Sequence, residues 1–318
     1  MQKRKLGNSG LQIPPLVLGG NVFGWTLDQA ASFRLLDEAL DAGLNFIDTA
    51  DVYSRFVPGH AGGESETIIG RWIRERNNRD RVVLATKVGM QMGPGKEGLS
   101  KAYILRAVED SLRRLQTEYI DLYQSHTDDA HTPIEEVLGT YADLIRAGKV
   151  RAIGASNYTG ARLAQALETS KRQGLPRYES LQPLYNLHDR AGYETDLEDI
   201  CRRHGLGVFP YFALASGFLT GKYRSKQDLE GKARSFIVAP YLTPRGDAIL
   251  KALDGAARSL HGTPASVALA WLIARPSVTA PIASATSSAQ LRSLLEAIDL
   301  KLDPRTIEAL DRASGAHG

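Results

Sequence analysis

The sequence has a single cysteine, Cys201, among its 318 residues, so a disulfide within the chain is excluded. Sparse cysteine is typical of proteins kept in a reducing compartment, and we expect a cytoplasmic location. Cys201 falls within a predicted helix, where a buried thiol that serves packing is the simplest interpretation.

Long apolar runs are also missing. No segment of the sequence approaches the roughly 20 consecutive apolar residues that a transmembrane helix requires. The basic residues 1–5 are followed by a turn-forming Gly-Asn-Ser-Gly segment, and not by the apolar core of a signal peptide. We therefore expect a protein without a membrane partner.

Neither sign of charge dominates. The 39 Lys and Arg residues nearly balance the 36 Asp and Glu residues, which leaves a formal net charge of +3. This excess is too small to favour nucleic acid or an anionic membrane as a partner, although a local basic pocket for a small anion would not show in a net count. The content of 43% hydrophobic and 24% charged residues is that of an ordinary globular protein.

The sequence does contain a regular alternation of strand and helix patterns. Short apolar runs predict strands at residues 16–18, 45–48, 82–87, 120–125, 150–155, 180–184, 207–211 and 277–282. Helical patterns follow them at residues 28–42, 65–76, 101–115, 133–147, 160–173, 194–204, 264–274 and 288–297. Such alternation indicates an α/β fold with a parallel sheet, and eight units favour a closed (β/α)8 TIM barrel.

Segments outside this alternation extend the predicted barrel. Residues 5–11 have turn residues flanked by apolar ones and predict an N-terminal β-hairpin. Residues 212–262 form a long excursion rich in Gly, Pro and Arg, and residues 303–314 predict a helix beyond the repeating units. With these extra C-terminal helices, and with no break in composition, residues 1–318 are expected to form a single barrel domain.

Four side chains that can hold or transfer a proton stand at the ends of successive predicted strands. Asp48 and Tyr53 end or follow the second strand, Lys87 ends the third, and His126 follows the fourth. The carboxyl ends of barrel strands converge on one face, so we expect these four residues to meet there. Each alone is better explained as structural, but their joint placement favours a catalytic site.

The chemistry of this set suits a carbonyl group. A tyrosine hydroxyl has an unperturbed pKa of about 10 and is a poor acid at neutral pH unless a cation lies beside it. Lys87, kept charged by Asp48, would lower the pKa of Tyr53, which could then give a proton to a carbonyl oxygen. His126 would donate a hydrogen bond to the same oxygen and orient the substrate.

The segments around these residues resemble the aldo-keto reductase family. The resemblance is carried by Asp-Thr-Ala-Asp-Val-Tyr, Ala-Thr-Lys-Val-Gly and Asp-Leu-Tyr-Gln-Ser-His, and by further motifs at residues 154–158, 181–186 and 217–223. It implies a barrel enzyme that reduces aldehydes or ketones to alcohols reversibly, acting on a small-molecule carbonyl or alcohol. It also implies NADP(H) as cofactor, with NAD(H) as the alternative, and gives Asp48, Tyr53, Lys87 and His126 the catalytic roles.

The same resemblance implies where the cofactor binds. Three positions match the residues that hydrogen-bond the nicotinamide carboxamide in the family, namely Ser156, Asn157 and Gln182. Tyr211 matches the aromatic residue that stacks on the nicotinamide ring. The positions that match the pyrophosphate site are Leu214, Gly217, Lys222 and, more loosely aligned, Arg234. Phe212 and Ala213 depart from the usual Ser-Pro start of this loop, which removes a serine hydroxyl contact and leaves the backbone amides.

The adenosine end of the implied site departs further. Many members have Lys or Gly at the position of Ser284, and Arg or Gln at that of Gln290. A Lys or Arg there would pair with the 2′-phosphate of NADP. Arg292 is close enough in sequence to substitute. The preference for NADP(H) therefore follows from the family and not from these residues.

The loop at residues 54–63 follows Tyr53 directly and is longer than the usual link to the next helix. It carries Phe56, an apolar residue that a surface loop does not need, and several glycines that allow it to move. We interpret Phe56 as a substrate-binding residue of a lid, against the alternative of a tolerated surface insertion.

Two other readings of the sequence remain open. Asp and His residues at 126–131 could serve a metal-dependent barrel hydrolase, although the paired His-x-His of such enzymes is absent. A cofactor-binding regulatory subunit without turnover would share the fold, and the sequence leaves the oligomeric state open. The Gly-x-Gly-x-x-Gly match at residues 93–98 stands several residues beyond its strand, so we interpret it as a loop and not as a phosphate cradle.

Overall fold

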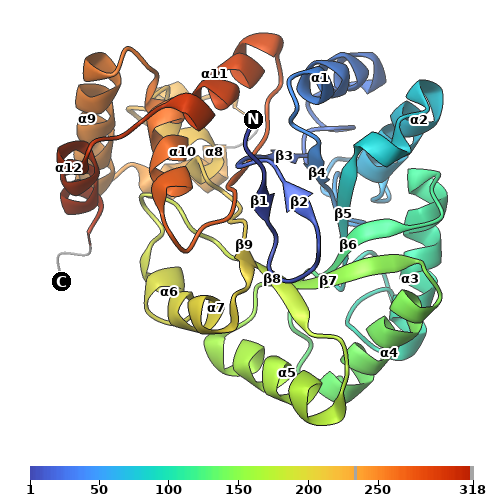
Figure 1. The fold of residues 1–318 in the computed structure, drawn as a ribbon. Helices are drawn as coiled ribbons and strands as arrows, with labels where there is room; N and C mark the ends of the chain where they lie inside the picture. The colour runs from blue at the N-terminus through green and yellow to red at the C-terminus, as the bar shows by residue number, and fades with distance from the viewer. Residues whose placement is uncertain (233–234, 316–318) are drawn as a thin grey trace.

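The computed structural model describes residues 1–232 and 235–315. In this part of the chain eight parallel strands form one sheet in the order β10-β3-β4-β5-β6-β7-β8-β9 (Figure 1). Their bounds are β3 Val17–Gly19, β4 Phe46–Asp48, β5 Val83–Val88, β6 Ile120–Ser125, β7 Val150–Ser156, β8 Tyr178–Gln182, β9 Gly207–Val208 and β10 Ile282–Ala283. The Ile282 amide donates to the Pro210 carbonyl at 2.9 Å, so the two edges of the sheet meet. The predicted (β/α)8 barrel is confirmed.

Helices cover the outside of the sheet. They are α1 Gln29–Asp41, α2 Glu64–Arg76, α3 Lys101–Leu115, α4 Ile134–Arg146, α5 Gly160–Gln173, α6 Ala191–Glu194, α7 Glu198–His204, α10 Pro264–Ala274 and α11 Ser288–Asp299. Most of them bury one face, while α10 is buried on all sides. In α3, Ile104, Val108 and Leu112 recur every four residues and are buried, while the Ser100 side chain accepts from the Tyr103 amide and begins the helix. None of the helices in the described part of the chain combines the length and apolarity that a membrane span needs.

A hairpin closes the amino end of the barrel. Strands β1 (Arg4–Lys5) and β2 (Gln12–Ile13) pair antiparallel and lie in front of the sheet in Figure 1. Leu6 and Ile13 are completely buried and pack with inward-facing residues of the strands, among them Phe46 and Phe209. The predicted N-terminal hairpin is thus confirmed, and it forms the floor of the barrel.

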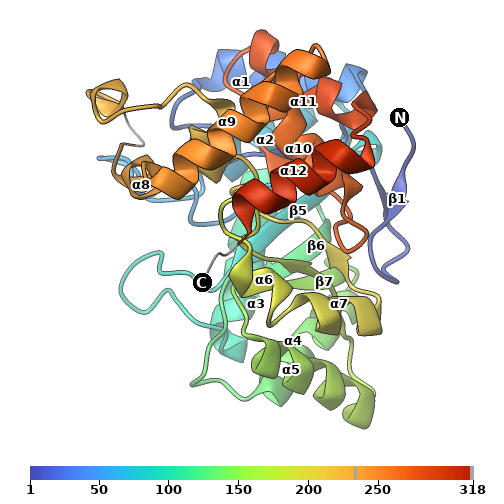
Figure 2. The ribbon, with the colours of Figure 1, turned by 90° about the vertical axis from the view of Figure 1, so that its left-hand side faces the viewer.

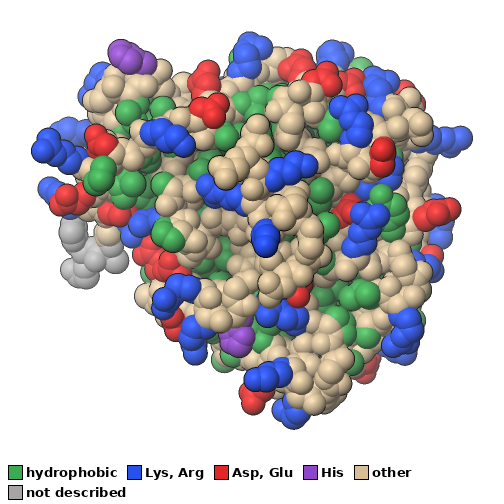
Figure 3. All heavy atoms as spheres, viewed as in Figure 1, with side chains coloured by type: hydrophobic (Ala, Val, Ile, Leu, Met, Phe, Trp, Pro, Cys, Tyr) green, Lys and Arg blue, Asp and Glu red, His purple; other side chains and the backbone are tan. Residues whose placement is uncertain are grey.

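The carboxyl ends of the strands open on the opposite side. The segment between β5 and α3, coloured teal, projects away from the hairpin in Figure 2. On the hairpin side, basic and acidic side chains are interspersed and neither sign forms an extended field (Figure 3). The long loops therefore gather at one end, where the predicted site residues stand.

The long excursion contains a helix that the sequence reading missed. Helix α9 (Pro244–Ser259) begins after the Thr243 cap and packs against the terminal helix α12 (Pro304–Ser314), as Figure 2 shows. Between β9 and α9 the chain also forms short helical turns η2 (Ala215–Thr220), η3 (Gln227–Leu229), α8 (Ser235–Val238) and η4 (Ala239–Tyr241). The expected extra C-terminal helices are present, and α9 adds to them.

Three expected elements differ from the structure. The helix expected at residues 194–204 is broken into α6 and α7, because Asp196 leaves the helical path and its Oδ2 accepts from the Gly160 amide at 2.7 Å. The last strand, expected at residues 277–282, begins only at Ile282. The strand expected at residues 207–211 ends at Val208. Prolines account for both changes, since Pro281 and Pro210 have no amide to donate to a neighbouring strand.

Candidate active site

Three of the four predicted proton-handling residues form one hydrogen-bonded set. Lys87 Nζ donates to Asp48 Oδ2 at 2.7 Å, to the Thr49 carbonyl at 2.7 Å and to Tyr53 Oη at 2.9 Å. Lys87 and Asp48 are fully buried, and Tyr53 is half-buried. The ammonium group thus has a carboxylate on one side and the phenol hydroxyl on the other.

The backbone after β4 explains why Tyr53 returns to Lys87. Asp48 lies opposite Ala85 of β5 in the sheet, two residues before Lys87. The chain then turns, with the Tyr53 amide donating to the Ala50 carbonyl at 3.3 Å. Ser54 follows in a left-handed conformation (φ 72°), and its hydroxyl is held by the Phe23 carbonyl at 3.0 Å. This turn carries the tyrosine from the strand end back over the lysine.

The pKa values of this set correct one expectation. Burial alone would lower the pKa of Lys87, but the Asp48 carboxylate and the Tyr53 hydroxyl outweigh it, so the pKa is raised and the side chain stays charged. Burial raises the pKa of Tyr53, and the Lys87 cation opposes that rise without cancelling it. Lys87 therefore acts in the expected direction, but the expected net lowering of the Tyr53 pKa is wrong.

His126 lies across from Tyr53. The two rings meet edge to face with centroids 6.0 Å apart. Burial, together with the Lys87 cation, lowers the pKa of His126 well below its ordinary value of 6.5, so the imidazole is neutral at pH 7. Its Nδ1 is buried without a hydrogen bond from any described residue. The structure thus brings all four predicted residues to one place.

The predicted nicotinamide residues stand at the neighbouring strand ends. Ser156 Oγ donates to the Gln182 carbonyl at 2.9 Å, and Asn157 Nδ2 donates to the His126 carbonyl at 2.8 Å. Tyr211 Oη donates to Asn157 Oδ1 at 2.9 Å. These four predicted residues, from β7, β8 and the end of β9, therefore form one connected set beside His126.

Gln124 belongs to the site, and the sequence reading missed it. It lies in β6, is fully buried, and donates from Nε2 to Asp48 Oδ1 at 3.1 Å. Gln182 Nε2 donates to the same oxygen at 2.9 Å. Gln124 stands two positions before His126, which puts both side chains on the same side of the extended chain, and this spacing was a signal that could have identified Gln124.

The loop predicted to hold the pyrophosphate has an unusual backbone. Phe212, Ala215 and Ser216 have φ values of 53°, 47° and 56°, and Gly217 has 100°. Such conformations cost about 1–3 kcal/mol each in residues other than glycine and collect at functional sites. Asn186 Nδ2 donates to the Phe212 carbonyl at 3.0 Å and helps to hold the loop in place.

The polar groups of this loop suit an anion. Ser216 Oγ is buried with no hydrogen bond from the described residues, and successive amides in such turns form anion-binding concavities. Lys222 lies close by, since a Cβ placed on Gly217 would be 3.6 Å from its Nζ. Leu214 precedes η2 and is half-buried. Arg234 lies outside the described residues.

The adenosine-end candidates bond to their own neighbours. Ser284 Oγ donates to Asn21 Oδ1 at 2.6 Å, and Gln290 Oε1 accepts from the Thr286 amide at 2.8 Å. Arg292 is exposed on α11. Ser284 directly follows β10, while Gln290 and Arg292 lie in the first turns of α11, and neither position 284 nor position 290 has a cationic side chain.

Phe56 lies in the loop that follows Tyr53 in the chain. The Phe56 side chain is 62% exposed and meets the Trp25 ring edge to face at a centroid distance of 4.8 Å. The loop ends at α2, where Glu64 Oε1 accepts from the amides of Ala61 and Gly62 at 2.9 and 3.2 Å. Phe56 is thus an exposed apolar side chain on the loop that follows Tyr53.

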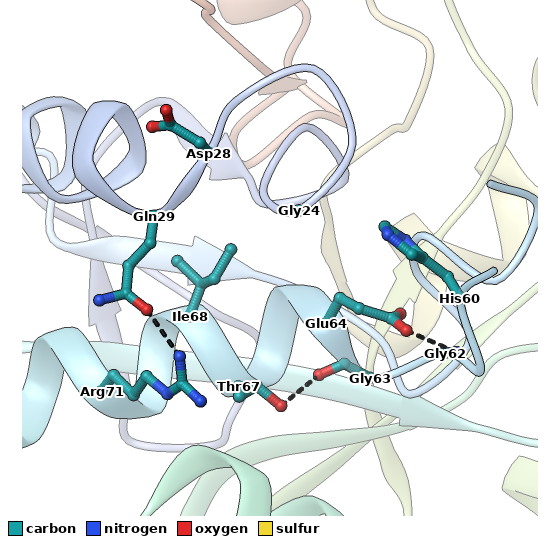
Figure 4. Close-up of a pocket in the computed structure, with 10 residues that line it drawn as sticks. All are labelled: Gly24, Asp28, Gln29, His60, Gly62, Gly63, Glu64, Thr67, Ile68 and Arg71. Carbon is teal, nitrogen blue, oxygen red and sulfur yellow. Dashed lines mark hydrogen bonds between the residues drawn. The ribbon is translucent and has the colours of Figure 1, made fainter. Parts of the chain in front are cut away.

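A pocket of about 340 Å³ opens on the outer side of this loop, against α2 and the start of α1 (Figure 4). His60 lines it from the loop, Glu64 and Arg71 line it from α2, and Gln29 lines it from α1. The Arg71 guanidinium donates to Gln29 Oε1 at 2.7 Å. None of the four predicted catalytic residues lines this pocket, so it is separate from the predicted site.

The remaining sequence candidates have structural partners. Burial raises the pKa of Cys201 in α7 to about 12, which leaves the thiol protonated. Asp128 is paired with Arg162 at 2.7 Å, and Asp129 accepts from the Leu99 amide at 2.8 Å. Residues 93–98 form a turn in which the Lys96 amide donates to the Gly93 carbonyl at 3.0 Å. Among the described residues no cluster of His, Cys, Asp and Glu could hold a metal ion.

Known proteins resemble the chain over nearly its whole length. A model described as the aldo/keto reductase family matches residues 15–314. The chain is 35% identical to a Bacillus subtilis (strain 168) protein named uncharacterized oxidoreductase YrpG, over 98% of this chain and 95% of that protein. It is 32% identical to the L-glyceraldehyde 3-phosphate reductase of Escherichia coli (strain K12), over 94% of this chain and 88% of that protein. It is 34% identical to a probable voltage-gated potassium channel subunit beta of Arabidopsis thaliana, over 94% of this chain and 92% of that protein.

Proposed function

Because the chain belongs to the aldo/keto reductase family, we propose that it catalyses the reversible, NADP(H)-dependent reduction of aldehydes or ketones to alcohols. The observation that carries this proposal is the contact of 2.9 Å between buried Lys87 Nζ and Tyr53 Oη. A phenol paired with a fixed cation at the open end of a barrel is suited to protonate an oxygen that gains negative charge.

The residues present fit a nicotinamide cofactor. Asn157 and Gln182 would hold the carboxamide, the Tyr211 ring would lie against the nicotinamide, and the loop of Ser216 and Gly217 would hold the pyrophosphate. The orphaned hydroxyl of Ser216 and the left-handed turn around it support the last assignment. When bound, the cofactor exchanges a hydride with the carbonyl carbon.

The chain itself supplies the proton and its control. Tyr53 gives its hydroxyl proton to the substrate oxygen as that oxygen gains charge, and Lys87 stabilises the phenolate that remains. Asp48 compensates the charge of Lys87 and fixes the ammonium beneath the hydroxyl, at 2.7 Å from Oδ2. In the oxidative direction the phenolate takes the proton back from the alcohol.

His126 is suited to a neutral hydrogen-bonding role. Because its pKa lies well below 6.5, it does not compete with Tyr53 as an acid at pH 7. Its neutral ring would donate a hydrogen bond to the carbonyl oxygen and fix the direction from which Tyr53 protonates it. The exposed Phe56 beside this position would contact the rest of the substrate.

The other functions considered receive less support. A cofactor-binding subunit without turnover would not need the connected set of Asp48, Lys87 and Tyr53. A metal-dependent hydrolase is not favoured by the family to which the chain belongs.

A screen of aldehydes, ketones and sugars tests the proposal. Nicotinamide absorbance would be followed with the purified protein and either NADPH or NADH, with and without a chelator. We expect chelator-insensitive turnover of at least one carbonyl class. Tight cofactor binding with no turnover of any carbonyl would favour the regulatory subunit instead, and chelator-sensitive hydrolysis would favour the metal enzyme.

A further inference from the structure

Two glutamine side chains lie between the Asp48–Lys87 pair and the predicted nicotinamide site. Gln124 Nε2 and Gln182 Nε2 both donate to Asp48 Oδ1, at 3.1 and 2.9 Å. Gln182 Nε2 also donates to Gln124 Oε1, at 3.3 Å. All of these side chains are buried, so water does not compete for the bonds.

The network fixes which way the Gln182 amide faces. Its nitrogen has two hydrogens, and both face acceptors, one on Asp48 and one on Gln124. Turning the amide over would place its oxygen against a carboxylate oxygen and a second carbonyl oxygen, which repel it. Gln182 Oε1 is consequently directed away from both, and no described residue donates a hydrogen bond to it.

The orientation of Gln124 is fixed in the same manner. Its Nε2 faces the Asp48 carboxylate and its Oε1 faces the nitrogen of Gln182. Gln124 therefore donates a hydrogen bond to the Asp48 carboxylate and accepts the second hydrogen of the Gln182 amide. A leucine or methionine of similar size would fill the space but do neither.

We propose that Gln124 is a positioning residue that presents the Gln182 carbonyl oxygen to the carboxamide NH2 of the nicotinamide cofactor. The inference rests on the proposed function, because it requires a nicotinamide to bind beside Gln182. It assigns to Gln124 a role in cofactor recognition although Gln124 itself contacts Asp48 and Gln182 and not the cofactor.

Equilibrium binding of two oxidised cofactors tests this role without relying on turnover. The probes are NADP and its 3-acetylpyridine analogue, in which a methyl group replaces the carboxamide NH2. Wild type should bind NADP more tightly by about fivefold, the usual worth of one neutral hydrogen bond. In Gln124→Leu and Gln124→Met the ratio should fall clearly below the wild-type value, since only the Asp48 carboxylate then opposes turning of the Gln182 amide.

Gln124→Glu is the rescue variant. Whether protonated or ionised, a glutamate at this position still accepts from Gln182 Nε2, so the ratio of the two affinities should stay near the wild-type value. The same variant places a second carboxyl group beside Asp48, which raises the pKa of Lys87 and Tyr53 when ionised. The pH–rate profile should therefore move to higher pH while cofactor discrimination is retained.

Tyr123→Phe is the matched control. Tyr123 precedes Gln124 in β6, is equally buried, and its hydroxyl has no hydrogen bond from the described residues. In Tyr123→Phe the ratio of the affinities for NADP and its analogue should equal that of wild type. The inference would be overturned if Gln124→Leu kept an affinity ratio of about five, if Gln124→Glu lost the preference for NADP, or if Tyr123→Phe lost it as fully as Gln124→Leu. It would also be overturned if wild type bound NADP and its analogue equally. A wild type that binds no nicotinamide nucleotide would instead refute the proposed function.

Discussion

The hydroxyl of Tyr53 is the acid closest to the buried lysine, and its removal makes the most direct prediction. Tyr53→Phe should bind cofactor with unchanged affinity and lose carbonyl reduction by about 10²–10⁴-fold, the usual contribution of general acid catalysis. Cofactor titration and steady-state kinetics with one non-activated ketone measure the two effects. Turnover near the wild-type rate would remove Tyr53 from the proposed role.

Lys87 should control the pH at which Tyr53 works. Reduction needs the protonated phenol, so the rate falls as pH rises through the pKa of Tyr53. Burial already raises the pKa of Tyr53, and Lys87 opposes this increase. In Lys87→Met the decline of kcat with pH should therefore occur at higher pH, and kcat should be lower at every pH. The measurement is kcat against pH for both proteins; superimposable profiles would contradict the prediction.

Asp51, two residues before Tyr53, predicts a pH-dependent stability. It is buried, and neither carboxylate oxygen has a hydrogen bond from the described residues. Burial, and then the Glu66 carboxylate, raise its pKa well above 3.8, and Arg114 only partly opposes them. The folded state therefore holds the proton of the Asp51 carboxyl more tightly than the unfolded state does. The free energy of unfolding consequently falls as pH rises from about 3.8 through the pKa of Asp51 in the folded state.

Asp51→Asn removes the ionisable group and with it the loss of stability at high pH. The variant should gain stability relative to wild type at pH 8 and gain less at pH 4.5, as measured by urea unfolding at both values. Asp37 is the control of opposite sign: burial alone would raise its pKa, but bonds from Arg76 and Trp72 lower it. Asp37→Asn should therefore lose stability about equally at pH 8 and pH 4.5, since the contribution of Asp37 is lost only as pH falls from about 3.8 through its lowered folded pKa. An effect of Asp51→Asn that is independent of pH would argue against this account.

At the scale of elements, the loop at residues 54–63 predicts substrate range. Phe56 is exposed and meets the Trp25 ring edge to face, so much of its apolar surface is available to a ligand. Phe56→Ala should change kcat/KM between small and bulky carbonyls by about 1–3 kcal/mol, the worth of one apolar contact. Pro58→Ala, in the same loop, controls for general disturbance. A uniform change across the panel would leave the loop as a surface insertion.

Elements with a strong local pattern were predictable from the sequence. The structure has α3, α5, α10 and β6 at the expected residues, because their apolar spacing and caps agree with the fold. Helix α9 was missed because Pro, Gly and Arg in its first turn obscured the later pattern of Ile249, Leu250 and Leu253. That apolar spacing was a usable signal.

Contacts between distant segments were not predictable. The break between α6 and α7 depends on Asp196 reaching the start of α5, which no local pattern reveals. For the site, strand ends predicted which residues would converge. They could not predict that burial outweighs Lys87 in setting the pKa of Tyr53, because burial depends on the whole fold.

At the scale of the whole molecule, the predicted adenosine site lies where the segment before α1 meets the segment before α11, since Ser284 donates to Asn21. With neutral side chains at 284 and 290, NADPH should bind more tightly than NADH by only a small factor. Gln290→Arg, at an exposed position, should increase this preference through a charge-assisted bond to the 2′-phosphate. Gln290→Met controls for loss of the Thr286 contact. Equilibrium binding of both cofactors is the measurement, and tighter binding of NADH by wild type would overturn the assignment.

The hairpin floor has a consequence for isotope exchange. With Leu6 and Ile13 sealing the amino end, water can approach the fully enclosed ammonium of Lys87 from the mouth alone. There its outward contact is the Tyr53 hydroxyl, at 2.9 Å. Deuterium should therefore reach the Lys87 ammonium by way of Tyr53, and a ligand that covers Tyr53 should slow this labelling in proportion to its residence time.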